Sequence, residues 1–232
     1  LIMLNDYKNI RVDKRKRYLL VVDIETANII NDALAYDIGF AVTDKKGQIY
    51  YTGSLMIADL FIDNKDLLQT AYYKEKLPKY WLDYKKGTRD LVTLLTAKCL
   101  IRDIMKHFNI KDVFAYNARF DYTGLNRTER YINKSKYRYF FPYGTEIHCI
   151  MKMAKQVLFT QKQFIDFALA NDLKTPSGKF LSNTAETAYK YITRNTEFTE
   201  SHTGLEDVLI ETKIMAKCFR QHKKMETKLF SK

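Results

Sequence analysis

A short apolar run near the N-terminus restricts the fold more than any other feature of the sequence. Residues 18–22 (Tyr-Leu-Leu-Val-Val) are continuous, partly β-branched and too few for a helix of ordinary length, which predicts a buried central strand. The run leads directly into Asp23-Ile24-Glu25-Thr26. Two more strands, at residues 37–42 and 48–52, flank a short polar connection that ends in a glycine, as in a hairpin. The domain is therefore expected to open with three strands.

Helical periodicity follows the predicted hairpin. Apolar residues recur mostly at intervals of three and four across residues 88–108, which predicts one amphipathic helix. Residues 111–116 predict a fourth strand, and a helix is expected from Asn117 to about Tyr131. The last third of the chain predicts helices at residues 150–158, 161–171, 185–192 and 204–221. Strands followed by helices in this way indicate the α/β class.

Length and cysteine content limit the class of protein. A chain of 232 residues suits one domain, which we expect at residues 18–222, between a basic N-terminal extension at 1–17 and a basic C-terminal tail at 223–232. The three cysteines are widely spaced and form no CxxC pair, which argues against a disulfide framework and a structural zinc site. Because no apolar stretch reaches the length of a membrane span, a cytoplasmic protein without membrane association is expected.

The charge balance favours an acidic partner. The chain carries 39 Lys and Arg against 27 Asp and Glu, a formal net charge of +12, and a field of that sign concentrates nucleic acid or anionic membrane near a protein. The sequence has no long basic amphipathic helix and no lipidation signal, so nucleic acid is favoured over membrane. Charge alone leaves a solvated basic surface without any partner as an open alternative.

Two acidic residues stand at the end of the first predicted strand. The alternation of side chains along a strand sends Asp23 and Glu25 to the same face, with Ile24 on the other. Neighbouring carboxylates repel each other, and a hard cation such as Mg²⁺ or Mn²⁺ would neutralise them. Taken alone, the pair is explained more simply as a solvated strand end.

Two further clusters carry similar groups. Asp121 stands where the fourth strand meets its helix, a position that could merely favour the positive helix N-terminus. His202 precedes the last helix and could equally be a polar cap, and Asp207 follows in about the first turn. The remaining histidines and Cys149 lack partners at recognisable ligand or nucleophile spacing, so they are expected to be structural or surface residues: His107, His148 and His222.

Taken together, the three clusters resemble the three motifs of the DnaQ-like 3′-to-5′ exonuclease superfamily, in its DEDDh branch. Asp23-x-Glu25 matches the first motif, Asn117-x-x-Phe120-Asp121 the second, and His202-x-x-x-x-Asp207 the third, in the same order and on the same kinds of element. Residues 37–40 also resemble the second-strand pattern of the family. The resemblance spans about residues 18–221, is closest to polymerase proofreading domains, as in phage or prophage proteins, and suggests insertions near residues 56–86 and 131–144.

The resemblance implies a fold, a reaction and a set of site residues. The fold would be ribonuclease H-like, an α/β fold with a mixed central sheet flanked by helices. Two divalent cations, Mg²⁺ or Mn²⁺, would be held by four carboxylates, those of Asp23, Glu25, Asp121 and Asp207, with Asp23 between the two cations. His202 would accept the proton of the attacking water, and nucleoside 5′-monophosphates would leave from the 3′ end. Contacts with the nucleic acid are assigned to Thr26, Ala27 and Asn117.

A basic aromatic stretch at residues 131–141 is a second candidate for contact with nucleic acid. Cations alternate there with rings, as is typical of surfaces that follow a single strand. The residues expected to take part are Lys134, Lys136, Tyr137 and Arg138. About half of the rings in this stretch could instead pack the insertion onto the domain.

The substrate and the partner stay open at this level. DNA is favoured because the resemblance is closest to polymerase-associated domains, and the same resemblance suggests a polymerase partner. RNA end-trimming is the alternative within the enzyme class, since no sequence pattern reports on a ribose 2′-hydroxyl contact. A subunit that holds nucleic acid or a polymerase without cutting is the alternative of a different class, and the complete set of five active-site residues argues against it.

Overall fold

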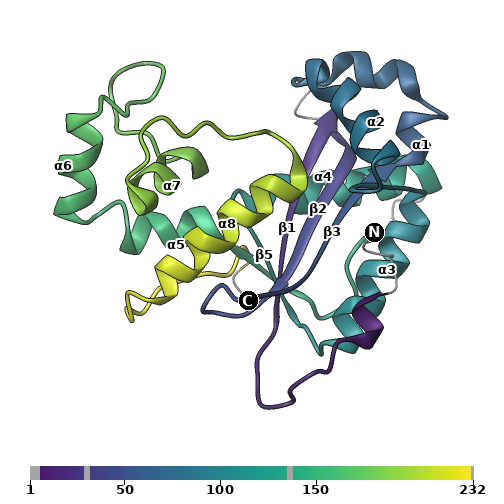
Figure 1. The fold of residues 1–232 in the computed structure, drawn as a ribbon, viewed down its shortest axis with the longest axis horizontal. Coiled ribbons are helices and arrows are strands. Elements are labelled where there is room, and N and C mark those ends of the chain that lie inside the picture. The colour runs from purple at the N-terminus through teal and green to yellow at the C-terminus, as the bar shows by residue number, and fades with distance from the viewer. Residues whose placement is uncertain (1–5, 29–31, 135–137, 231–232) are drawn as a thin grey trace.

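The computed structural model describes residues 6–28, 32–134 and 138–230, which build a six-stranded mixed sheet with helices on both faces (Figure 1). The strands are β1 (Leu19–Ala27), β2 (Leu34–Thr43), β3 (Ile49–Ile57), β4 (Asp90–Val92), β5 (Asp112–Ala115) and β6 (Glu146–Cys149). Their order is β4-β3-β2-β1-β5-β6, and β2 runs antiparallel to the other strands. A first strand at the centre and a reversed second strand give the ribonuclease H-like arrangement, which confirms the predicted fold.

β1 occupies the centre of the sheet because both of its faces are apolar. Leu20 and Val22 face one layer of helices, and Leu19 and Val21 face the other. The first layer contains α3 (Leu94–His107) and α4 (Ala118–Asn133). The second contains α5 (Ile150–Val157), α7 (Ala185–Thr193) and α8 (Gly204–Phe219), and α6 (Lys162–Ala170) packs on α7 (Figure 1).

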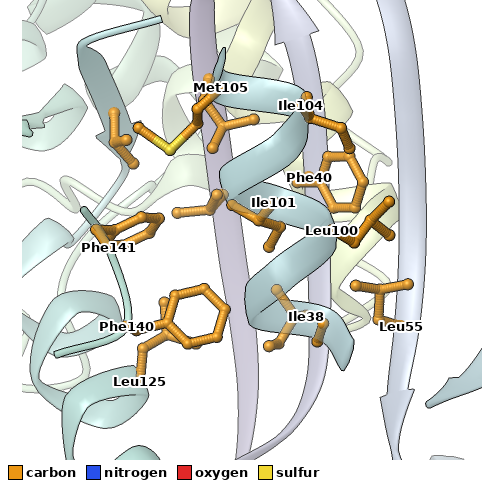
Figure 2. Close-up of a cluster of buried hydrophobic side chains, with 14 of the residues drawn as sticks. Ile38, Phe40, Leu55, Leu100, Ile101, Ile104, Met105, Leu125, Phe140 and Phe141 are labelled. Atoms are coloured by element: carbon orange, nitrogen blue, oxygen red, sulfur yellow. The ribbon is translucent and has the colours of Figure 1, made fainter. Parts of the chain in front are cut away.

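The larger hydrophobic core lies between α3 and the sheet. Figure 2 shows side chains of α3 pointing toward β2 and β3, with two phenylalanines from the segment after α4 closing the core on the other side. Those rings, Phe140 and Phe141, are buried and lie edge to face with centroids 5.2 Å apart. Part of the predicted basic aromatic stretch is therefore core, as its packing alternative expected.

The helix predicted at residues 88–108 is wrong over its first residues. Asp90, Leu91 and Val92 instead pair in parallel with residues 55–57 of β3 and extend the sheet as β4. The helix begins only at Leu94, after Thr93, whose side chain accepts the backbone N–H of Thr96 and caps α3. Local periodicity could not show that these three residues would pair with the free edge of a neighbouring strand.

The insertion expected near residues 56–86 is helical. It contains α1 (Ala58–Phe61), the 3-10 turns η3 (Lys65–Thr70) and η4 (Lys74–Lys76), and α2 (Leu77–Lys85). Tyr80 of α2 is fully buried with Tyr36 of β2 and Phe61 of α1, in a separate apolar cluster at the end of the sheet. The insertion thereby covers the edge of the molecule near the ends of β1 and β2, where the carboxylates lie.

The segments outside the predicted domain bounds also contact the sheet layers. Tyr7, in the turn η1 (Asp6–Asn9), is buried against Tyr51 and His107. Near the other end, the carbonyl of Thr227 accepts the N–H of Cys149, and Leu229 donates its N–H to Ile147. Within the described ranges, no helix is both long and apolar enough to cross a membrane.

Candidate active site

The three predicted motifs meet in one cavity of about 310 Å³ at the carboxyl ends of β1 and β5. All five residues expected to be catalytic line this cavity: Asp23, Glu25, Asp121, His202 and Asp207. β1 supplies the first two, the first turn of α4 supplies Asp121, the segment that leads into α8 supplies His202, and the first turn of α8 supplies Asp207. Residues separated by more than 180 positions are brought together because α8 packs against one face of β1, which pairs with β5 in the sheet.

Three of the carboxylates already form a potential cation site. One oxygen each from Asp23, Glu25 and Asp207 lies within 4.8 Å of the others. No lysine or arginine is among the described residues that line the cavity. Oxygen atoms at this density without a protein cation are the donor set that Mg²⁺ and Mn²⁺ prefer.

Asp121 gives an independent sign that a cation belongs here. Its side chain is buried, and its Oδ1 atom has no hydrogen-bond partner among the described residues. An unsatisfied buried oxygen costs roughly 1 to 3 kcal/mol, and a bound cation would satisfy it. The residues present therefore fit a divalent metal.

Backbone contacts fix the helix that carries Asp207. Thr203 donates its N–H to Asp207 Oδ2 at 3.0 Å, and its hydroxyl donates to Glu206 Oε2 at 2.7 Å. Gly204 rests directly on Gly39 of β2, where a Cβ atom would come within 2.0 Å of the carbonyl carbon of Gly204. Glycine at position 39 is therefore required for α8 to approach the sheet closely enough to deliver Asp207.

A buried ionic network holds the same helix from the other side. Asp37 of β2 is fully buried, and its Oδ2 accepts the N–H of Gly204 at 2.9 Å and the hydroxyl of Tyr80 at 2.8 Å. Arg89 pairs with Asp37 and also donates to Glu206 at 2.9 Å. The network connects β2, α2, the start of β4 and the first turn of α8.

The site carboxyls hold their protons unusually tightly in the metal-free protein. Burial, reinforced by the neighbouring carboxylates, raises the pKa of Glu25 to about 9 and that of Asp207 to about 8. Burial likewise raises the pKa of Asp121 to about 7 and that of Asp23 well above its usual range. All four shifts report the cost of burying a charged carboxylate with no cation to offset it, and for Asp23, Glu25 and Asp207 the neighbouring carboxylates add to that cost.

His202 is held by an aromatic stack. Its ring lies parallel to that of Tyr73, next to η4, with centroids 4.0 Å apart and an interplanar angle of 8°. Its backbone is left-handed, with φ at 53°, which is uncommon for a residue other than glycine. Burial and the nearby charge of Lys76 lower the pKa of the imidazole, which favours the neutral form of the ring.

The cavity also contains two carboxylates that sequence reasoning missed. Glu211 is buried, accepts the N–H of Tyr116 at 3.2 Å, and contributes to the raised pKa of Asp23. Burial raises the pKa of Glu200 to about 7. Glu211 follows Asp207 by four residues on α8, a spacing that places both on one helix face and could have identified it. For Glu200, the only indication in the sequence was its position close to His202 along the chain.

The residues predicted to contact nucleic acid are placed differently from one another. Asn117 is exposed and lines the cavity, whereas the side chain of Ala27 is buried in the cluster of Tyr36, so any contact of Ala27 would come from its backbone. Thr26 is half-buried on β1. Lys134 and Arg138 are exposed outside this cavity, and Lys136 and Tyr137 lie outside the described residues.

A second group of potential ligands has its own protein cations. Asp112, Glu146 and His148 each offer an atom within 4.8 Å of the others, so His148 has carboxylate partners that the sequence did not indicate. Arg17 binds Asp112 at 2.8 Å, and Lys228 binds Glu146 at 2.7 Å. These contacts join both ends of the chain to β5 and β6, which supports a structural role.

Comparisons with known proteins give matches among solved structures only. No family model matches the sequence, and no curated protein matches it. Among solved structures, the chain is similar to one described as the Mg²⁺- and Mn²⁺-bound form of Pop2p from S. pombe, with 15% sequence identity and a TM-score of 0.47. The similarity covers 88% of this chain and 83% of that one.

Proposed function

We propose that this chain is a divalent-metal-dependent 3′-to-5′ exonuclease that releases nucleoside 5′-monophosphates from nucleic-acid ends. The observation that supports this most directly is the carboxylate cavity, in which four motif carboxylates and a histidine converge with no lysine or arginine among the described lining residues. A purely structural arrangement would leave the unpartnered oxygen of Asp121 and the mutual repulsion of the carboxylates unexplained.

The side chains divide the chemistry among themselves. Asp23, Glu25, Asp121 and Asp207 would hold divalent cations, which when bound supply Lewis-acid activation of water and stabilise charge on the phosphodiester. The lowered pKa of His202 favours the neutral ring, which can accept a proton at a ring nitrogen, and its stack on Tyr73 restricts the plane of the ring. The buried walls of the cavity keep these groups in a low-dielectric environment, where their interactions are strong.

One experiment separates the functional classes. DNA and RNA strands of the same sequence, labelled at the 3′ or the 5′ end, are incubated with the protein and Mg²⁺, Mn²⁺ or excess chelator, and the products are resolved on a gel. We expect stepwise shortening of 5′-labelled strands and immediate release of a labelled mononucleotide from 3′-labelled strands, with both ions but not with chelator. Activity that is undiminished in chelator would overturn the proposal.

The same gel decides between the open alternatives. The DNA preference and the polymerase partner expected from the sequence remain proposals, and comparison of the DNA and RNA lanes distinguishes a DNA-trimming enzyme from an RNA-trimming one. Strand binding without any shortening in either metal would favour a subunit that holds nucleic acid without cutting it.

A further inference from the structure

A groove between α4 and the start of β6 lies on the side of α4 that faces away from the carboxylate cavity. Its lining has the composition of a site for single-stranded nucleic acid. Its main cavity, of about 610 Å³, is lined by the cations Lys98, Arg102 and Arg138, and by no carboxylate among the described residues. Five rings also line it, those of Tyr122, Tyr139, Phe141, Tyr143 and Phe230. A second cavity of about 350 Å³ shares Tyr143 and Phe230 with the first and continues past the start of β6.

The rings of the groove are available to a ligand. Tyr143 is fully exposed, and Tyr139 and Phe230 are at least half exposed. Only the packing of Phe230 on Tyr122, with centroids 5.3 Å apart, links these three exposed rings to another ring in the described structure. Solvent-exposed rings beside cations are the combination that stacks bases and neutralises phosphates along a strand.

The cations of the groove differ in whether hydrogen bonds and ion pairs within the protein already occupy them. Lys98 forms a buried pair with Glu129, and Arg102 donates to the backbone carbonyls of Tyr139 and Phe140 at 3.1 Å. Arg138 is exposed and has no hydrogen-bond or ion-pair partner in the part of the chain that the structure describes. Arg138 is therefore the cation that a phosphate would meet first.

The position of the groove relates it to the carboxylate cavity. Phe120 lines the carboxylate cavity, and Tyr122 lines the groove. Because these two residues are two positions apart in the first turns of α4, their side chains point to roughly opposite sides of that helix. Six carboxyl groups and no lysine or arginine among the described residues line the carboxylate cavity, so the cavity offers a phosphate chain no positive group until cations bind there. A strand with its 3′ end in that cavity needs attraction from another surface.

The other basic cluster near the sheet fits this role less well. In the N-terminal segment, Arg15 is paired with Asp13, Lys16 with Tyr50 and Arg17 with Asp112. The hollow beside that segment is lined by residues 11–15 and contains no ring among the described residues. Cations alone would attract a polyanion but could not stack its bases.

We propose that the groove between α4 and the start of β6 binds single-stranded nucleic acid upstream of the 3′ end, with bases on Tyr143 and Phe230 and a phosphate on Arg138. This inference rests on the proposed function for the direction of the strand, but the binding itself does not require cleavage. The chemistry recognised is a phosphate backbone with planar bases, which DNA and RNA share.

The test measures binding as a function of strand length. Fluorescence anisotropy with end-labelled DNA and RNA of about 4 and about 12 nucleotides is performed in the Asp121→Asn background with Ca²⁺, so that the ligand stays intact. Tyr143→Ala and Phe230→Ala should each weaken binding of the longer strand by about 5- to 150-fold, the effect of one lost base stack. The shorter strand, held by the carboxylate cavity, should be bound as by the parent.

Charge and control variants complete the design. Arg138→Gln should reduce the slope of log affinity against log salt by about 0.7, as expected for one phosphate contact on a single strand. The matched controls are Tyr84→Ala and Lys85→Gln, an exposed ring and an exposed cation on α2, neither of which lines the groove. Both should bind like the parent, and circular dichroism checks that Phe230→Ala, which loses its contact with Tyr122, still folds.

The outcomes separate this inference from the proposed function. If all three groove variants bind both lengths like the parent, the groove is not a strand site, whatever the enzyme does. If the parent protein cleaves no strand but the groove variants selectively lose the longer one, the exonuclease proposal fails and the groove is established. Comparison of the DNA and RNA arms shows which nucleic acid it prefers.

Discussion

Asp121 has a buried carboxylate oxygen that no described group satisfies, and its pKa is raised to about 7. Replacing it with asparagine removes the charge but keeps the shape. We expect Asp121→Asn to abolish hydrolysis and to leave the melting temperature in chelator equal to or higher than that of the parent, because one source of repulsion is lost. Product release from labelled strands and thermal unfolding by circular dichroism measure the two effects.

The control for this substitution is an aspartate in a different environment. Asp166 is exposed, is paired with Lys162 on α6 and does not line the cavity. Asp166→Asn should leave activity intact and change stability by less than about 1 kcal/mol. A marked fall in the melting temperature of Asp121→Asn would instead give Asp121 a structural role.

His202 is expected to act as a general base. His202→Ala should lower the rate by roughly 10² to 10⁴, the usual contribution of such a group, while metal-induced stabilisation persists. Burial and Lys76 lower the pKa of this imidazole, so its neutral form is complete at a lower pH than for a free histidine. The histidine-linked rise of the parent rate should therefore lie at lower pH than an unperturbed histidine predicts.

The pH profile and the metal response together check this assignment. The acid limb due to His202 should be absent from the profile of His202→Ala, and the exposed His222 provides the control, since His222→Ala should behave like the parent. Loss of the metal-induced rise in melting temperature in His202→Ala would mark His202 as a metal ligand rather than a base.

At the scale of single residues, the sequence predicted the site residues that belong to recognisable motifs. It missed the site residues that only the packing of distant segments brings into the cavity. Asp23 and Glu25 share a face by strand alternation, and the structure brings them to Asp207. Glu200 and Tyr73 enter the site from segments whose paths depend on tertiary contacts. No local pattern encodes a stack between residues 73 and 202, because neither residue constrains the other along the chain.

Among the elements, α8 depends most on contacts outside itself. Arg89 is 4% exposed and connects the fully buried Asp37 to Glu206 in the first turn of α8. Arg89→Ala would leave Asp37 charged without its cation, and breaking a buried pair in this way costs about 3 to 5 kcal/mol. We expect a loss of this size in denaturant unfolding, with weaker metal binding because Asp207 is carried by the same helix.

A surface ion pair and a double substitution test the explanation. Lys162→Ala, which breaks the exposed pair with Asp166, should cost about 0 to 1 kcal/mol. Adding Asp37→Asn to Arg89→Ala should recover part of the lost stability, since the uncompensated charge is removed. Equal stability of Arg89→Ala and the parent would show that Asp37 is neutral in the folded protein.

Elements with a strong local period were predicted, and those that depend on a neighbour were not. The strands β1, β2, β3 and β5 and the helices α3 to α8 were expected from apolar patterns, with boundaries that differ by a few residues. β4 is three residues long and β6 four, and both are strands because a parallel partner is available beside them. Such short segments carry too little periodic signal to show their pairing.

At the scale of the whole molecule, negative groups are concentrated in one cavity of a protein that is positively charged overall. The chain has a net charge of +12, but six carboxylates gather in one cavity without a lining cation among the described residues. Without metal, this cavity concentrates repulsion that folding must overcome. Divalent cations would convert the same region into a stabilising centre, so the response of stability to pH should depend on whether metal is present.

Metal-free stability should fall as the pH rises from about 7 to about 9. The pKa values of Asp121, Asp207 and Glu25 are raised to about 7, 8 and 9, so over this interval the folded protein binds more protons than the unfolded chain. The free energy of unfolding then decreases with pH, and the loss is complete only above the highest of these pKa values. The lowered pKa of His202 makes the free energy of unfolding increase with pH, but only at lower pH than this interval.

Thermal unfolding at several pH values in this interval, with chelator and with Mg²⁺, measures the effect. In chelator the melting temperature should decline with pH, whereas the rise produced by Mg²⁺ should grow, because the cation competes with fewer protons for the same oxygens. Glu25→Gln should flatten the decline in chelator and reduce the Mg²⁺ response together, since both arise from one carboxylate. A metal-free melting temperature that stays level or rises across the interval would show that these carboxylates are neutralised within the protein itself, and the site would then have no need of a cation.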